Sequence, residues 1–124
     1  MLALTNPSEA YRRVDFDARV KGADPKELVT LCYEQFISAL GSAIFAHDRG
    51  DNRLKSQALT RALAAVTALK LGINQNEGIA GALFRFYEGT RRALLDNVLT
   101  FDPERVAAIR QDFIEVVGAM TRES

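Results

Sequence analysis

Hydrophobic positions recur at spacings of three and four along most of the chain, and no stretch alternates with period two for long enough to predict a strand. Proline and glycine interrupt this pattern at helix-length intervals. The predicted elements are an N-terminal segment over 1–22 and bundle helices over 25–48, 52–73, 77–99 and 103–121. Long helices with short connections pack as antiparallel neighbours. The sequence therefore predicts a single all-α domain over 1–124, an antiparallel up-down four-helix bundle with a short N-terminal helix or segment packed on it.

Polar residues with a capping side chain stand where the predicted helices begin. Asp24 precedes a proline at the first helical position, Pro25, and Glu27 can complete a reciprocal capping pair. The same aspartate–proline pair recurs before the last helix. The expected N-caps are Asp24, Asp51, Asn76 and Asp102.

The predicted helix over 25–48 is apolar around more of its circumference than a bundle helix needs. A helix that buries one face shows an apolar stripe about a third of the circumference wide. Here one apolar line comprises Leu28, Cys32, Ala39 and Ala43, and a second comprises Val29, Tyr33, Phe36, Ile37, Leu40 and Ile44. The helix is therefore either central in the bundle or one wall of a groove that a partner fills.

Composition and charge narrow the function classes. The chain of 124 residues is 48% hydrophobic, with a formal net charge of +0, so no strong positive field favours nucleic-acid binding. Cys32 is the one cysteine, which excludes a disulfide within the chain and fits a reducing, cytoplasmic setting. No uninterrupted apolar run reaches about 18 residues, and the N-terminus lacks the pattern of a secretory signal. We expect no membrane span.

Candidate chemistry is sparse. His47 and Cys32 lie about four turns, roughly 22 Å, apart on one predicted helix, too far to act as a nucleophile pair. Zinc sites, di-iron carboxylate bundles and phosphate loops need residue sets that the sequence does not contain. We therefore expect no catalytic, cofactor or metal site, and not an enzyme. One alternative is a histidine phosphotransfer bundle using His47, although Arg49 and Gly50 follow at the wrong spacing.

The order of motifs resembles the FliS family of flagellar secretion chaperones over essentially the whole chain. A tyrosine in the N-terminal segment is followed by a helix that opens Pro-x-x-Leu-Val-x-x-x-Tyr-acidic, and later by "ALFRFYEGTRRALLDN". The matching residues are Tyr11, Pro25, Leu28, Val29, Tyr33, Glu34, Leu83, Tyr87, Arg92, Leu94 and Leu95. The final "FDPERVAAIRQDFIEVVGAM" is similar to the family's last helix.

The resemblance implies a cytoplasmic export chaperone that binds the C-terminal helical region of flagellin, prevents its premature polymerisation and aids its delivery to the type III export apparatus. It also implies an N-terminal segment that covers part of the binding groove. An export-gate component or a co-chaperone is a further candidate partner. The other alternative left open is a homodimeric helical adaptor; as a chaperone, the protein is expected to be a monomer or a weak homodimer.

Helical spacing selects the residues expected at this groove. Two side chains of the N-terminal segment are expected to occupy it, and its walls are expected to come from the helices over 25–48 and 77–99. The predicted partner-binding residues are Tyr11, Val14, Tyr33, Ile37, Leu40, Ile44, Leu83 and Tyr87.

Overall fold

The computed structural model describes residues 22, 24–73 and 79–123. Within these residues the helices are α2 (Pro25–Asp48), α3 (Asn52–Leu71), α4 (Ala80–Leu99) and α5 (Pro103–Glu123), and no strand is present. The predicted all-α four-helix bundle is confirmed. The N-terminal segment over 1–21 lies outside the described residues, and the single-domain assignment stays a prediction.

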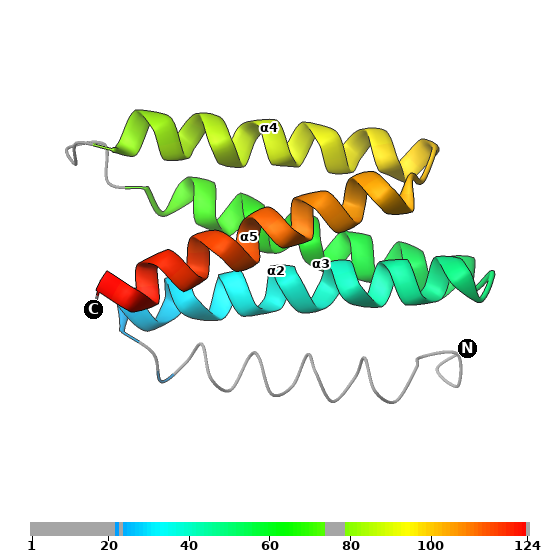
Figure 1. Ribbon diagram of the computed structural model, residues 1–124, viewed down its shortest axis with the longest axis horizontal. Coiled ribbons are helices and arrows are strands. Elements are labelled where there is room, and N and C mark those ends of the chain that lie inside the picture. Colours follow the sequence, from blue (N-terminus) through cyan, green and yellow to red (C-terminus); the bar gives the residue numbers. More distant parts are fainter. Residues whose placement is uncertain (1–21, 23, 74–78, 124) are drawn as a thin grey trace.

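The helices run alternately up and down, so that each is antiparallel to the one before it (Figure 1). The helix α2 lies against both α3 and α5, whereas α4 packs on α3 and meets α5 over a smaller contact. Because α2 has neighbours on two sides, it must bury an apolar face wider than a single stripe. This position accounts for much of the width of its apolar surface.

Three of the four predicted N-caps are confirmed. The side chains of Asp24 and Asp51 accept hydrogen bonds from the amides of Glu27 and Leu54 at 2.8 and 3.0 Å. The Asp102 carboxylate accepts from the amides of the first turn of α5 at 3.1 and 3.3 Å. Asn76 lies outside the described residues, and α4 begins at Ala80 without a side-chain cap.

Three predicted boundaries differ from the observed ones, the first being the start of α4, which lies at Ala80 and not at residue 77. The helix α3 ends at Leu71 with Gly72 as its C-cap, so the predicted end at residue 73 was wrong. Glycine is a poor helix former, and the apolar Ile73 continues the stripe without continuing the helix. The last helix extends to Glu123, past the predicted end at 121.

The turn between α2 and α3 is a Schellman motif. Gly50 has φ of +71°, and its amide donates to the His47 carbonyl at 3.0 Å. The amide of Asp51 donates to the carbonyl of Ala46 at 2.9 Å. A left-handed residue is required at this point, and glycine adopts it without steric cost. The motif reverses the chain within a few residues, which sets α3 alongside α2.

An aromatic cluster forms the centre of the core, with Phe113 of α5 fully buried in it. The Phe113 ring lies 4.1 Å from that of Phe36 and 5.5 Å from that of Tyr33, measured between centroids. From α4, Phe86 and Tyr87 approach it at 5.0 and 6.4 Å. One side chain of α5 thus packs against both α2 and α4.

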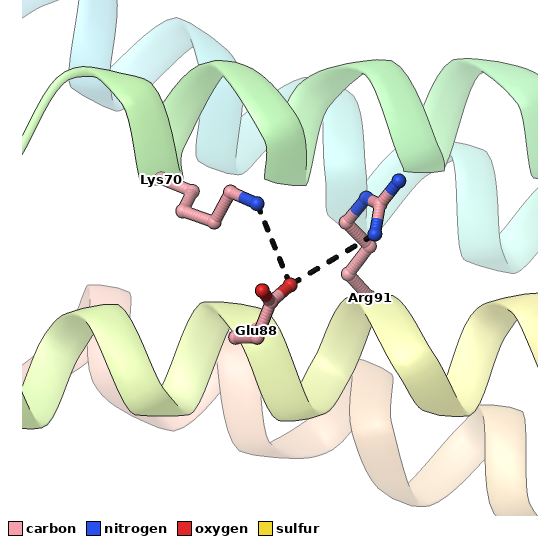
Figure 2. A network of polar contacts seen from close by, with 3 residues as sticks. All are labelled: Lys70, Glu88 and Arg91. Carbon is pink, nitrogen blue, oxygen red and sulfur yellow. Dashed lines mark hydrogen bonds and ion pairs between the residues drawn. The ribbon is translucent and has the colours of Figure 1, made fainter.

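On the side of α4 that faces α3, a polar network connects the two helices (Figure 2). The Glu88 carboxylate lies 3.4 Å from Lys70 Nζ and 3.9 Å from Arg91 Nη1. These side chains remain partly exposed, so water screens the pairs and each contributes less than about 1 kcal/mol. The network orients the two helices, and apolar burial supplies most of the stability.

By length and composition alone, α2 could cross a membrane, because its segment Glu27–Asp48 has a mean hydropathy of 1.4. Within the bundle, 33% of the most apolar window of this segment is buried. The central helix of a soluble bundle can meet the same criterion. The exposed positions Thr30, Glu34 and Ser38 form a polar line at helical spacing on α2, which a lipid-facing helix would not tolerate well. The absence of a membrane span stays a prediction.

We expect Phe113→Ala to destabilise the protein by about 3–5 kcal/mol, because it removes a fully buried ring and leaves a cavity among the surrounding rings. The matched control is Phe45→Ala on α2, where the ring is 53% exposed and the expected change is below about 1 kcal/mol. Urea unfolding measures both. Equal costs at the two positions would contradict the central role of Phe113.

Candidate partner-binding groove

An open groove of about 700 Å³ lies between α2 and α5. One side chain of α5, Arg110, and two adjoining lines of α2 residues, each at spacings of three and four, form it. The residues of this α2–α5 groove are Glu34, Ile37, Ser38, Gly41, Ser42, Phe45 and Arg110. Its length along α2 is about 16 Å, or three turns, which suits a short helical segment of a partner.

The floor of the groove depends on the close approach of Arg110 to Gly41. A Cβ atom at position 41 would lie 3.3 Å from Arg110 Nε and 3.6 Å from Nη2. The Nε–H donates a hydrogen bond to the carbonyl oxygen of Ile37 at 3.0 Å. Because glycine has no side chain, the guanidinium can lie directly on the backbone of α2. The groove therefore has a positively charged group in a fixed position on a floor of mostly small residues.

The two ends of the groove differ in charge. Glu34 is exposed at the end nearer the start of α2. At the other end Phe45 is 53% exposed, and the guanidinium of Arg49 lies 4.5 Å from its ring centroid. An exposed phenyl ring beside small residues offers an apolar anchor point, and an aromatic ring of this kind is a common centre of protein–protein binding.

A buried tyrosine pair joins α2 to α4 in the core. The hydroxyls of Tyr33 and Tyr87 are hydrogen-bonded at 2.5 Å. Burial is the main cause that raises the pKa of both phenols, and the shared hydrogen bond raises that of Tyr33 further. Both hydroxyls are neutral at physiological pH, so the pair is structural. Since the unfolded tyrosines ionise near pH 10, the stability of the fold falls as pH rises above that value.

The predicted partner-binding residues do not form one surface. Tyr33, Leu40 and Tyr87 belong to the core cluster, at 1%, 0% and 4% exposure. The first two are buried because α2 lies between α3 and α5, and Tyr87 of α4 packs against Tyr33 and Phe113. Any effect of these three on binding is therefore indirect, through the packing of the core. Ile44 and Leu83 are half-buried against the same core and do not line the groove.

Ile37 is the predicted residue that lines the α2–α5 groove. Tyr11 and Val14 lie outside the described residues, and their role stays a prediction. The sequence prediction did not include Gly41, Phe45 or Arg110. The small residues Ser38, Gly41 and Ser42 recur at spacings of three and four, a pattern that indicates a close approach or a hollow on that face.

The contacts of His47 and the burial of Cys32 indicate structural roles for both side chains. The Lys55 ammonium lies 3.2 Å from His47 Nδ1 and donates to it, and the His47 ring packs on Phe101 at 4.6 Å between centroids. His47 is half-buried in the last turn of α2, unlike the exposed mid-helix histidine of a phosphotransfer domain. Burial raises the pKa of the Cys32 thiol, which disfavours the reactive thiolate. Over the described part of the chain, no three potential metal ligands cluster.

A groove along two helices of a bundle is a common site for binding a partner helix. The family model described as flagellar protein FliS matches residues 7–119. The flagellar secretion chaperone FliS of Salmonella typhimurium (strain LT2) is 30% identical over 104 residues, which cover 82% of this chain and 77% of the relative. The chain belongs to the FliS family of flagellar secretion chaperones, as the motif order predicted.

The tyrosine pair gives a test of the core. We expect Tyr33→Phe and Tyr87→Phe each to cost about 1–2 kcal/mol, because each leaves the other hydroxyl buried without this partner. The double variant should cost less than the sum of the two, since it removes both hydroxyls together. Urea unfolding of the four proteins gives the coupling. Strictly additive costs would show that the hydroxyls do not stabilise each other.

Proposed function

We propose that this protein is a cytoplasmic export chaperone that binds the C-terminal helical region of flagellin, prevents premature polymerisation and aids delivery to the export apparatus. Membership of the FliS family supports the class, and the relative's name describes a secretion chaperone. The observation that most favours a helical client is the α2–α5 groove. Its small and apolar residues on α2 recur at spacings of three and four. We propose no enzymatic activity.

The geometry of the groove suits an amphipathic helix. Such a helix presents apolar side chains at spacings of three and four, and the groove offers positions at the same spacing. The client segment, unfolded when free, would have to become ordered on binding, which lowers the net affinity and keeps the complex reversible. Reversibility is what an export chaperone needs, because it must release its client at the export apparatus.

The N-terminal segment is proposed to compete with the client, with Tyr11 and Val14 as its anchors. Because this segment is joined covalently to the start of α2 at Pro25, its effective concentration near the groove is high. A chain that begins at Gly22 would then bind the client at least as tightly as the full chain. Markedly weaker binding would mean instead that the segment helps to hold the client.

Self-association is a separate proposal. The end of α4 exposes Leu95, Val98 and Leu99, at 42%, 53% and 90%. This patch is small, so we propose a monomer or a weak homodimer rather than an obligate one. Sedimentation velocity over a range of concentrations distinguishes these states. An export-gate component or a co-chaperone remains a further proposed partner.

Filling the groove gives the sharpest test of the proposed function. Gly41→Leu would place a side chain on the groove floor, next to Arg110, while raising the helix propensity of α2. We expect at least tenfold weaker binding of the cognate flagellin C-terminal peptide, by titration calorimetry, because about 1.4 kcal/mol or more of contact is lost. The helix content by circular dichroism should be unchanged.

The matched control is Gly89→Leu on α4, where a Cβ would meet nothing within 4 Å. This variant makes the same chemical change in another helix, away from the groove, and it should bind the peptide as the natural chain does. Equal losses at positions 41 and 89, or no loss at position 41, would contradict the assignment of the groove. Absence of micromolar or tighter binding by the natural chain would contradict the client itself.

A further inference from the structure

The guanidinium of Arg110 is held by a hydrogen bond from its Nε–H, which leaves the Nη edge facing the groove. Its Nε–H is bonded to the Ile37 carbonyl, and Nη2 rests near Gly41. The structure shows no hydrogen bond from its Nη groups to another described residue. Guanidinium groups bind carboxylates with two parallel N–H donors in a planar fork. Arg110 thus retains donors at the groove while its position is already fixed by α2.

Fixing the side chain in advance matters for affinity. A free arginine on a surface loses rotamer entropy when it pairs, which cancels much of the gain from a surface ion pair. Arg110 is half-buried and already bonded to the backbone, so less freedom remains to be lost. A carboxylate brought to this position would also be partly shielded from water by the Ile37 and Phe45 side chains that line the groove.

The charges around the groove define where an acidic partner group can sit. The charged residues that line it are Glu34 at one end and Arg110 near the middle, and Arg49 stands over Phe45 at the other end. Glu34 precedes Gly41 by about two turns of α2, or roughly 10 Å. A partner carboxylate is therefore attracted to Arg110, between the two ends of the groove, which fixes the position of a bound helix along α2.

We propose that Arg110 determines client specificity: it selects a helical segment with an aspartate or glutamate that has an apolar residue about one turn away on each side, one packing on Ile37 and the other on Phe45. This inference rests on the proposed function only in taking the α2–α5 groove as the client site. The selectivity comes from the planar fork as well as from the charge. Lysine at position 110 would keep the charge, but its ammonium could not reach the Ile37 carbonyl and a partner carboxylate in the same way.

The test is a double-mutant cycle on the full chain. Each aspartate and glutamate of the cognate flagellin C-terminal peptide is changed to its amide in turn, and affinities are measured for the natural chain and for Arg110→Gln. We expect one such change to weaken binding to the natural chain about tenfold, and to have little further effect with Arg110→Gln. Arg110→Lys should recover only part of the loss. Additive losses at every position would overturn the proposal.

The matched control is Arg105→Gln, an exposed arginine on the same helix that does not line the groove. It makes the same change in net charge, and it should bind all peptides as the natural chain does. A loss equal to that of Arg110→Gln would show that the effect is long-range attraction, and this outcome would also overturn the proposal.

A second set of probes separates this inference from the flagellin assignment. Synthetic amphipathic helical peptides, identical except for Glu, Gln or Lys at one position beside the apolar face, should bind the natural chain in that order. Arg110→Gln should remove the ranking. If the flagellin peptide does not bind but the ranking is kept, the client assignment falls and the role of Arg110 stands. A flat ranking with the natural chain would overturn the role of Arg110, whatever flagellin does.

Discussion

The burial of Phe113 is the interaction on which both the bundle and its groove depend. Its ring packs against Phe36 and Tyr33 of α2 and against Phe86 of α4, so it fixes α5 in relation to both helices. Arg110 stands one turn earlier on α5. When Phe113 is seated in the core, Arg110 is brought over α2 at Gly41, where its Nε–H reaches the Ile37 carbonyl. The position of the candidate binding group thus follows from the packing of the core.

One face of α2 packs in the core, and the adjoining face lines the groove. Its large buried side chains, Tyr33, Phe36 and Leu40, belong to the core between α3 and α5. The neighbouring line through Ile37, Gly41 and Phe45 is the wall of the groove. Because these faces adjoin on one helix, the packing that stabilises the fold also holds the groove open. A binding surface built on a rigid helix does not have to form when the partner arrives.

Most of the fold could be predicted from the sequence because its signals are local. Helical periodicity gave the four helices, and Asp24, Asp51 and Asp102 marked where three of them begin. The end of α3 was missed because Ile73 extends the apolar stripe past Gly72, and periodicity does not record where the backbone stops being helical. Of the expected groove walls, Ile37 was placed in the groove, whereas Tyr33, Leu40 and Tyr87 proved to be core.

The differences between the expected groove lining and the observed one have one physical cause. Whether an apolar line on α2 faces the core or a groove depends on the angle at which α5 lies against it, a tertiary property that the sequence of α2 does not contain. The place of Arg110 in the groove was missed for the same reason, since it lies on α5, far along the chain from Gly41. Only the small residues Ser38, Gly41 and Ser42 pointed locally to a hollow on this face.

Site-specific photo-cross-linking tests the central claim, that the α2–α5 groove receives the client, most directly. A photoreactive amino acid is placed at Ser38, an exposed groove position on α2, or at Ala64, an exposed position on α3 that does not line the groove. The account predicts a cross-link from position 38 to the C-terminal region of flagellin and none from position 64. A client that cross-links from position 64 and not from position 38 would contradict it.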